Sequence, residues 1–356
     1  MATETGRRTR LDPGVFRLPV DRIKAGYYSD AYFNFTRELL QESGRHPHVT
    51  MQVFQKRESV LGGIDEALAV LRLCSDDWDR LEVHALYEGD VIAPMETVMT
   101  IEGDYSLFAH LETVYLGCVA RRTLIMRNVA EVVEVANGKP ILFFPARHDH
   151  WLVQTGDGWA AHVAGAIGVS TDAQASWWGG RGVGTVPHAL IAAYGGDTIA
   201  AAAAFARRYA HDMNVTVLVD FDNDSVRTAL EVARALGPAL WGVRLDTSDR
   251  LADRSLQRRH GEHAAKGVAP ELVDLVRGEL DSNGFHDVKI VVSGGFDAER
   301  IRAFEAAGVP VDSYGVGSSL IRGANDFTAD VVVVDGRPCA KVGRELRPNT
   351  RLELVT

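Results

Sequence analysis

Cysteine is scarce in this chain of 356 residues: it has three, Cys74, Cys118 and Cys339, and they lie far apart. An odd and widely spaced set excludes a disulfide scaffold and a four-cysteine zinc site, and it fits the reducing cytoplasm, where we expect the protein. No run reaches the ~18 uninterrupted apolar residues of a membrane span. Basic residues near the N-terminus precede no apolar stretch, so we expect neither a secretory signal nor a membrane partner.

Lysine is also scarce, since only six of the 38 basic residues are lysine and the others are arginine. The planar guanidinium of arginine suits carboxylates and phosphates, whereas lysine suits Schiff-base chemistry. The 48 acidic residues give a net charge of −10, and no basic block is present. A dedicated nucleic-acid binder is therefore excluded, because such binding depends on neutralising phosphates.

The length predicts about two domains, and the texture of the sequence changes along the chain. Residues up to about 118 predict an α+β domain. Apolar residues recur with a helical period over 63–73, and apolar and polar residues alternate over 82–105, as in short strands. Glu88-Gly89-Asp90 and Glu102-Gly103-Asp104 predict turns between short strands. A long helix is expected over 112–135.

From residue 141 onward, short apolar runs alternate with helical patterns. The runs that predict buried parallel strands are 141–144, 215–219, 240–245, 288–292 and 311–316. Consecutive β/α units predict a parallel sheet, either open or closed as a barrel. In the last run, 329–343, apolar and polar residues alternate on either side of a turn at Asp335-Gly336. We expect this run to form part of the first domain and not another β/α unit.

Polar residues follow the predicted strands, where a β/α barrel carries its functional groups. They include Arg147, Ser170, Thr185, His188, Asp220, Arg244, Asp246 and Ser293. Two glycine loops, 293–295 and 315–319, come last and precede helices. Backbone N–H groups in such loops hold phosphate, so the order of the two loops predicts a phosphate site.

Several of these side chains allow more than one interpretation. His188 suits nucleophilic or acid–base work, or a plain structural role. His148 and His150 flank Asp149, but Pro145 argues against the continuous strand that a metal site would need. The carboxylates of Asp220, Asp222, Asp224, Asp246 and Asp249 could bind Mg²⁺. The alternative for Asp224 is a helix cap before 225–230. No lysine follows a strand, which disfavours a Schiff-base aldolase.

Eight stretches in this order and spacing resemble one family over nearly the whole chain. They are DAYFNFT (30–36), MQVFQKRESVLGGIDEAL (51–68), YEGDVIAPMETVMTIEGDY (87–105), FPARHDH (144–150), GTVPHAL (184–190), VRLDTSD (243–249), VSGGFD (292–297) and YGVGSSL (314–320). The chain resembles the nicotinate phosphoribosyltransferases, within the group that includes the nicotinamide and quinolinate enzymes. The resemblance implies an incomplete parallel, TIM-like α/β barrel over 119–327. It also implies an α+β domain over 1–118 that 328–356 completes.

The resemblance also implies a role for each matching residue. His188 would be phosphorylated by ATP, and Tyr32 of a neighbouring subunit would stack on the pyridine opposite Phe144. Arg147 would contact the ring substituent or a phosphate, and Arg244 and Asp246 would bind phosphoribosyl pyrophosphate. The remaining expected substrate contacts are Thr185, Ser293, Gly294, Gly295, Gly315 and Gly317. Mg²⁺ would accompany the pyrophosphate, with Asp220 and Asp222 as its expected ligands, and a homodimer or higher homo-oligomer would share active sites.

Two departures from the family pattern leave the base open. Asp172 stands where amide-using relatives carry an aspartate, and an ionised carboxylate there repels nicotinate unless a cation compensates it. Pro145-Ala146 and the following His-Asp-His replace a glycine-containing stretch. We expect a nicotinate phosphoribosyltransferase of NAD biosynthesis. The alternatives are a nicotinamide enzyme, a quinolinate enzyme, and a catalytically silent relative that binds pyridine nucleotides.

Overall fold

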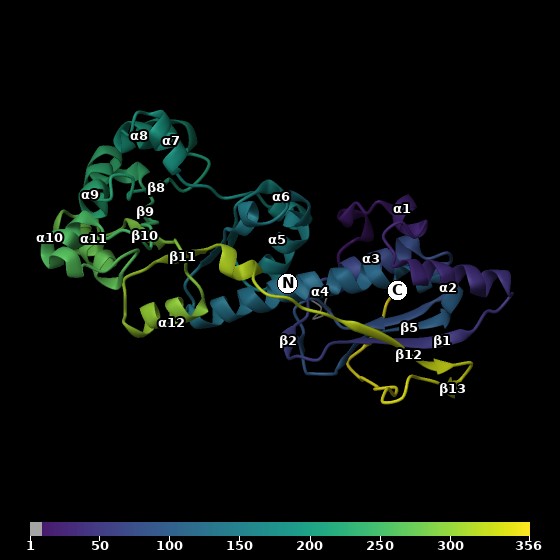
Figure 1. The fold of residues 1–356 in the computed structure, drawn as a ribbon. Helices are drawn as coiled ribbons and strands as arrows, with labels where there is room; N and C mark the ends of the chain where they lie inside the picture. Colours follow the sequence, from purple (N-terminus) through teal and green to yellow (C-terminus); the bar gives the residue numbers. More distant parts are fainter. Residues whose placement is uncertain (1–8) are drawn as a thin grey trace. The chain divides into compact units, whose positions relative to one another are not determined.

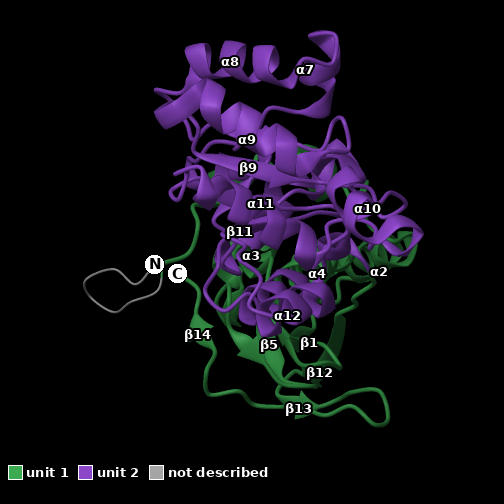
Figure 2. Cartoon of the chain, turned by 90° about the vertical axis from the view of Figure 1, so that its left-hand side faces the viewer, with its two compact units in different colours: residues 1–127, 323–356 green, residues 128–322 purple. Residues whose placement is uncertain are grey.

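The computed structural model describes residues 9–356, and the chain forms two compact units (Figure 2). One unit contains the residues up to Arg127 together with Gly323–Thr356, and the other is Asn128–Arg322. The division at Arg127 falls inside a single helix, α4 (Glu112–Val135), whose bounds match the long helix that the sequence predicts. Among residues 9–356, no helix has both the length and the apolar character that a bilayer crossing demands.

The first unit is built on a six-stranded antiparallel sheet with the order β13-β12-β1-β5-β3-β14 (Figure 1). Its strands are β1 (His48–Phe54), β3 (Glu82–Ala85), β5 (Thr97–Asp104), β12 (Thr328–Val334), β13 (Arg337–Pro338) and β14 (Glu353–Leu354). Two short strands of this unit, β2 (Ser59–Val60) and β4 (Val91–Ile92), pair with each other in a separate two-stranded sheet. The helices are α1 (Val20–Lys24), α2 (Ala31–Glu42), α3 (Ile64–Cys74) and the first part of α4.

Both ends of the chain contribute to this sheet, as predicted. β12 pairs with β1, with Val334 opposite Val49, and it turns into β13 through Asp335 and Gly336. Both turn residues have positive φ, 48° and 75°, which is the geometry of a two-residue hairpin.

The predicted turn at Glu102-Gly103-Asp104 is wrong. These residues are the end of β5, where Gly103 pairs with Val49 of β1. Gly103 serves a close approach instead: a Cβ there would lie 2.6 Å from the Leu81 side chain. The chain turns only afterwards, in the 3-10 helix Tyr105–Leu107.

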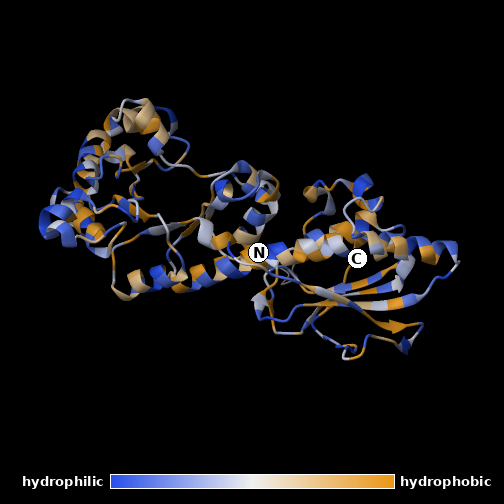
Figure 3. Cartoon of the chain, viewed as in Figure 1, coloured by the Kyte–Doolittle hydropathy of each residue, from blue (hydrophilic) through white to orange (hydrophobic). Residues whose placement is uncertain are grey.

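The apolar core of the first unit lies between its sheet and its helices. Ile64, Leu71 and Tyr115 are fully buried, and they join Met51 and Val53 of β1 in one cluster. Figure 3 shows hydrophilic and hydrophobic residues mixed along α4, and residues 122–126 in the middle of this helix are all buried.

The second unit carries a parallel sheet with the order β7-β6-β11-β10-β9-β8. Its strands are β6 (Ile141–Phe143), β7 (Gly168–Val169), β8 (Thr216–Leu218), β9 (Gly242–Leu245), β10 (Lys289–Val292) and β11 (Ser313–Val316). Its helices are α5 (Gln154–Val163), α6 (Asp172–Ala175), α7 (His188–Ala193), α8 (Thr198–Tyr209), α9 (Ser225–Leu236), α10 (Arg254–His260), α11 (Pro270–Ser282) and α12 (Ala298–Ala306). All five apolar runs that predict strands are confirmed.

This sheet curls, as the predicted incomplete barrel requires. The segment 183–186 bonds to both edge strands of this sheet: Val183 N donates to Val169 O of β7 (2.7 Å), and Val186 N donates to Thr216 O of β8 (2.8 Å). The carboxyl ends of the strands therefore face one common edge.

Asp224 occupies the cap position before α9, but its side chain makes no capping hydrogen bond. Its carboxylate binds Arg258 instead, with Nη2 at 2.8 Å. The fully buried Asp253 accepts the bond from Ser225 N at 2.8 Å, and it also caps α10 by accepting from Ser255 N at 2.9 Å. The sequence could not reveal the bond to Ser225, because Asp253 lies 28 residues further along the chain.

Candidate active site

Arg244, Ser293 and Asp246 form a connected group at the carboxyl edge of the second unit's sheet. Arg244 is the residue before the last of β9, and its Nε donates to Ser293 Oγ at 2.8 Å. The Ser293 hydroxyl in turn donates to Asp246 Oδ1 at 2.7 Å, and Arg244 Nη2 lies 3.6 Å from Asp246 Oδ2. Parallel pairing of β9 with β10 brings these distant residues together. Burial lowers the pKa of Arg244, while Asp246 and Asp220 act in the opposite direction, and the guanidinium stays charged.

Phe144 follows β6 and presents its ring to the same group. The Arg244 guanidinium carbon lies 4.9 Å from the ring centroid, and Arg244 Nη1 also donates to Thr185 Oγ1 at 3.4 Å. Gly315 lies against the ring, since a Cβ there would come within 2.4 Å of Phe144 Cε2. Gly315 was expected in a phosphate loop, but it lies inside β11, where its missing side chain makes room for Phe144.

Two glycine turns border this group. Gly294 and Gly295 follow β10 with φ of 83° and 75°, and Gly294 lies against the Asp246 carboxylate. Gly317 precedes the short 3-10 helix Ser318–Ile321. A Cβ on Gly317 would lie 2.9 Å from Cε1 of His148, so this histidine adjoins the second turn. The sequence did not predict that His148 would lie beside a phosphate loop.

His188 begins α7 and pairs with Asp220, which follows β8. His188 Nε2 lies 2.9 Å from Asp220 Oδ1, and the Asp220 side chain is 7% exposed against 42% for the histidine. The hydrogen bond to Asp220 raises the pKa of His188, although partial burial opposes the shift. The arrangement resembles an oriented acid–base or nucleophilic histidine whose second nitrogen is available.

None of the other expected site residues forms a hydrogen bond or ion pair with this group in the described part of the chain. Asp222 lies 3.4 Å from Arg227, and both are exposed to solvent. Asp172 begins α6, is exposed, and accepts a hydrogen bond from Gly182 N at 2.9 Å. Arg147 is exposed and close enough to oppose the charge of Arg244. Tyr32 belongs to α2 of the first unit and is 59% exposed. Residues 9–356 contain no group of three His, Cys, Asp or Glu side chains arranged for a metal.

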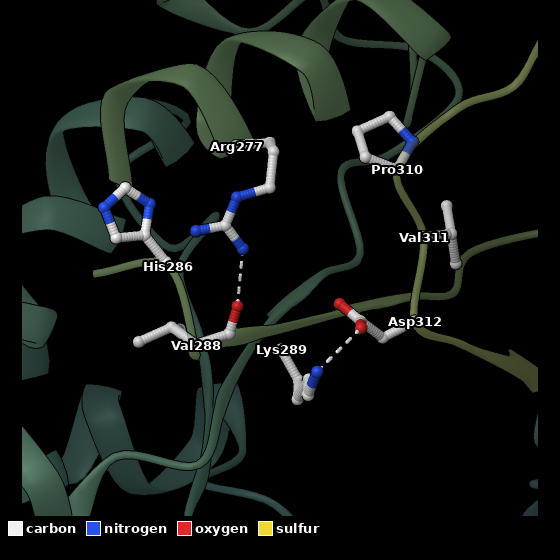
Figure 4. A pocket seen from close by; sticks show the side chains of 7 residues that line it. All are labelled: Arg277, His286, Val288, Lys289, Pro310, Val311 and Asp312. Carbon is white, nitrogen blue, oxygen red and sulfur yellow. Dashed lines mark hydrogen bonds and ion pairs between the residues drawn. The ribbon is translucent and has the colours of Figure 1, made fainter. Parts of the chain in front are cut away.

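A hollow of about 200 Å³ opens at the opposite edge of the same sheet (Figure 4). Its cations are already engaged: Arg277 Nη1 donates to Val288 O at 2.6 Å, and Lys289 Nζ lies 3.3 Å from Asp312. Because it adjoins the amino ends of β10 and β11, it is a poor candidate for the active site of a β/α barrel.

Comparisons with known proteins identify the family of the chain. The model of the N-terminal domain of quinolinate phosphoribosyl transferase matches residues 30–123. A nicotinate phosphoribosyltransferase of Mycobacterium tuberculosis is 32% identical, over 91% of this chain and 76% of that protein. The nicotinate phosphoribosyltransferase of Bacillus subtilis is 27% identical, over 67% of this chain and 45% of that protein.

Solved structures give the same result. The crystal structure of nicotinate-nucleotide pyrophosphorylase from Pyrococcus furiosus superposes with a TM-score of 0.79 at 32% identity, over 95% of this chain and 85% of that one. Human nicotinic acid phosphoribosyltransferase shares the fold, with a TM-score of 0.65 at 17% identity over 88% of this chain and 76% of that one. The chain therefore belongs to the nicotinate phosphoribosyltransferase family, within the group that also contains the quinolinate phosphoribosyltransferases.

Proposed function

We propose that this protein transfers ribose 5-phosphate from phosphoribosyl pyrophosphate to the ring nitrogen of nicotinate, giving nicotinate mononucleotide and pyrophosphate. The observation that carries the proposal is the group Arg244–Ser293–Asp246 beside the Gly294-Gly295 turn. It offers a cation, a carboxylate and backbone N–H groups in one place, which suits a sugar that bears phosphates.

In this reaction the bond from the ribose C1 to pyrophosphate breaks, and a bond from C1 to the pyridine nitrogen forms. The ribose passes through an oxocarbenium-like state, so catalysis is mostly positioning and stabilisation of charge. Asp246 accepts hydrogen bonds from the ribose hydroxyls, and Arg244 binds the departing pyrophosphate. Mg²⁺ would neutralise phosphate charge, and the carboxylates of Asp220 and Asp222 are the proposed protein ligands beside the substrate's phosphates.

Phe144 supplies the surface on which the pyridine stacks. Its ring already faces a guanidinium, and an electron-poor pyridine carboxylate suits the same environment. Arg147, on the turn that follows Phe144, is the proposed partner of the nicotinate carboxylate. Tyr32 from a neighbouring subunit would cover the other face of the base.

We propose that ATP drives the transfer through His188. Asp220 holds the proton of His188 on Nε2, so the lone pair of Nδ1 attacks the γ-phosphorus of ATP and ADP leaves. Hydrolysis of the phosphohistidine then releases phosphate. The two forms of the enzyme bind substrates and products differently, which couples hydrolysis to transfer.

The test is an assay with phosphoribosyl pyrophosphate and Mg²⁺, with and without ATP, and with nicotinate, nicotinamide or quinolinate offered separately. We expect nicotinate mononucleotide, formed faster with ATP. The absence of product from every base would overturn the proposal. His188→Ala should lose the ATP stimulation but keep slow transfer, while His211→Ala, at an exposed histidine away from the site, should keep both.

Asp172 keeps a nicotinamide enzyme as the second candidate. Its carboxylate is fixed by Gly182 N, and the structure of residues 9–356 gives it no ion pair. A carboxylate held after β7, next to β6 in the sheet, would accept from a carboxamide and repel a carboxylate. If nicotinamide is the only base that yields a mononucleotide, and if Asp172→Ala loses this activity, the protein is a nicotinamide enzyme and not a nicotinate enzyme.

A further inference from the structure

Gly294 and Gly295 form a turn whose backbone is held in one orientation. Both residues have positive φ, 83° and 75°, and turns are a conformation in which successive backbone N–H groups can form an anion-binding concavity. Neither N–H donates to an acceptor within residues 9–356. Glycine permits this shape but does not enforce it, because glycine is the most flexible residue of all. Something else must hold the turn.

Arg300, on the first turn of α12, makes the contact that holds it. Its Nη1 donates to Gly294 O at 2.8 Å and its Nη2 donates to Val268 O at 2.7 Å. The guanidinium carbon lies 4.2 Å from the ring centroid of Phe296, the residue that follows the turn. Arg300 is itself fixed, because its backbone N donates to Asp297 Oδ1 at 3.0 Å in the helix cap.

The direction of one carbonyl sets the direction of the next N–H. In a planar trans peptide, C=O and N–H point in opposite directions. Because Arg300 holds the Gly294 oxygen on its own side, the N–H of Gly295 points to the other side. Gly294 lies against the Asp246 carboxylate, so the turn adjoins the group that binds ribose in the proposed function.

We propose that Arg300 is a positioning residue that presets the Gly294-Gly295 turn to bind the phosphate of the ribose 5-phosphate moiety. This inference rests on the proposed function for the identity of the phosphate. Arg300 acts from behind the turn and touches no substrate. Its planar fork spans two carbonyls on separate segments, which a single ammonium group cannot do.

The test compares Arg300→Gln with Arg302→Gln, a matched change on the same helix at an exposed arginine. We expect Arg300→Gln to raise KM for phosphoribosyl pyrophosphate about tenfold, the scale of one lost hydrogen bond to a charged group. KM for nicotinate and kcat at saturation should change little. Arg300→Lys, which can reach only one of the two carbonyls, should recover part of the loss. Arg302→Gln should match the wild type.

Titration of the full-length protein with ribose 5-phosphate separates this inference from the proposed function. Weaker binding in Arg300→Gln supports the inference, even if no base yields a mononucleotide and the proposed function falls. Equal binding in Arg300→Gln and Arg302→Gln overturns it, as does a wild type that does not bind this probe. An equal rise in KM for both substrates also overturns it, because general loosening of the fold would have that effect. If Arg300→Gln does not fold, Arg300→Lys decides by the same comparison.

Discussion

Gly315 and Gly317 lie where any side chain would meet a ring of the candidate site. A Cβ on Gly315 would come within 2.4 Å of Phe144, and one on Gly317 within 2.9 Å of His148. Glycine is needed at these two positions for the space it leaves, because neither has a positive φ. The requirement follows from contacts between segments more than 150 residues apart in the sequence, so spacing along the chain could not reveal it.

Gly315→Ala should displace the Phe144 ring and weaken stacking of the base. We expect kcat/KM for the base to fall by about tenfold or more, because small displacements at a reacting centre are costly. Overpacking should also lower the free energy of unfolding by about 1–3 kcal/mol. The control is Gly278→Ala, at an exposed position of α11 with open space around it, which should be neutral or slightly stabilising. Unchanged kinetics in Gly315→Ala would contradict the role of Phe144.

The His188–Asp220 pair predicts a pH dependence of stability. Because Asp220 raises the pKa of His188, the folded state favours the protonated histidine. The contribution of the pair is therefore fully present below about pH 6.5, the ordinary value, and is lost as the pH rises through the raised pKa. The difference in Tm between wild type and Asp220→Asn should be larger at about pH 6 than at a pH above the raised pKa of His188, provided that the carboxylate of Asp220 is ionised at both. Asp222→Asn, on the same loop, should show no such trend.

At the scale of the elements, apolar runs and helical periods were sufficient to predict the strands of the parallel sheet and the helix Glu112–Val135. Local patterns failed where a distant segment decides the outcome. Glu102-Gly103-Asp104 has the composition of a turn, but pairing with β1 draws it into a strand. Asp224 occupies the N-cap position of α9, but its carboxylate accepts a hydrogen bond from Arg258 and does not cap the helix. The roles carried over from the family stay predictions, although the structure brings Arg244, Asp246, Ser293, Thr185 and Phe144 together.

Asp253 joins two helices of the second unit, so its loss should cost more than the loss of an ordinary cap. It accepts from Ser225 N at the start of α9 and from Ser255 N and Oγ at the start of α10. We expect Asp253→Ala to lower the free energy of unfolding by about 2–3 kcal/mol. Asp197→Ala removes a single exposed cap, that of α8, and should cost about 1 kcal/mol. Equal costs in urea unfolding would show that Asp253 does not join the helices.

At the scale of the whole molecule, the proposed sharing of active sites between subunits predicts complementation. Tyr32→Ala and Arg244→Met should each be nearly inactive, the first because the base loses its cover and the second because phosphoribosyl pyrophosphate loses its cation. In an equal mixture of dimers that exchange subunits, half are mixed and each mixed dimer has one intact site, so about a quarter of wild-type activity should return. No recovery after exchange would place Tyr32 in its own subunit's site or outside any site.

The pairing of β12 with β1 also sets the order in which the protein can fold as it is made. Val49 and Val334 are partners, yet roughly 280 residues separate them, which a ribosome adds in about 15 to 60 s. All of Asn128–Arg322 emerges within that interval and can fold first, while β1 waits with one edge unpaired. An open strand edge is a site of aggregation, so the nascent first unit carries this hazard until β12 has been made.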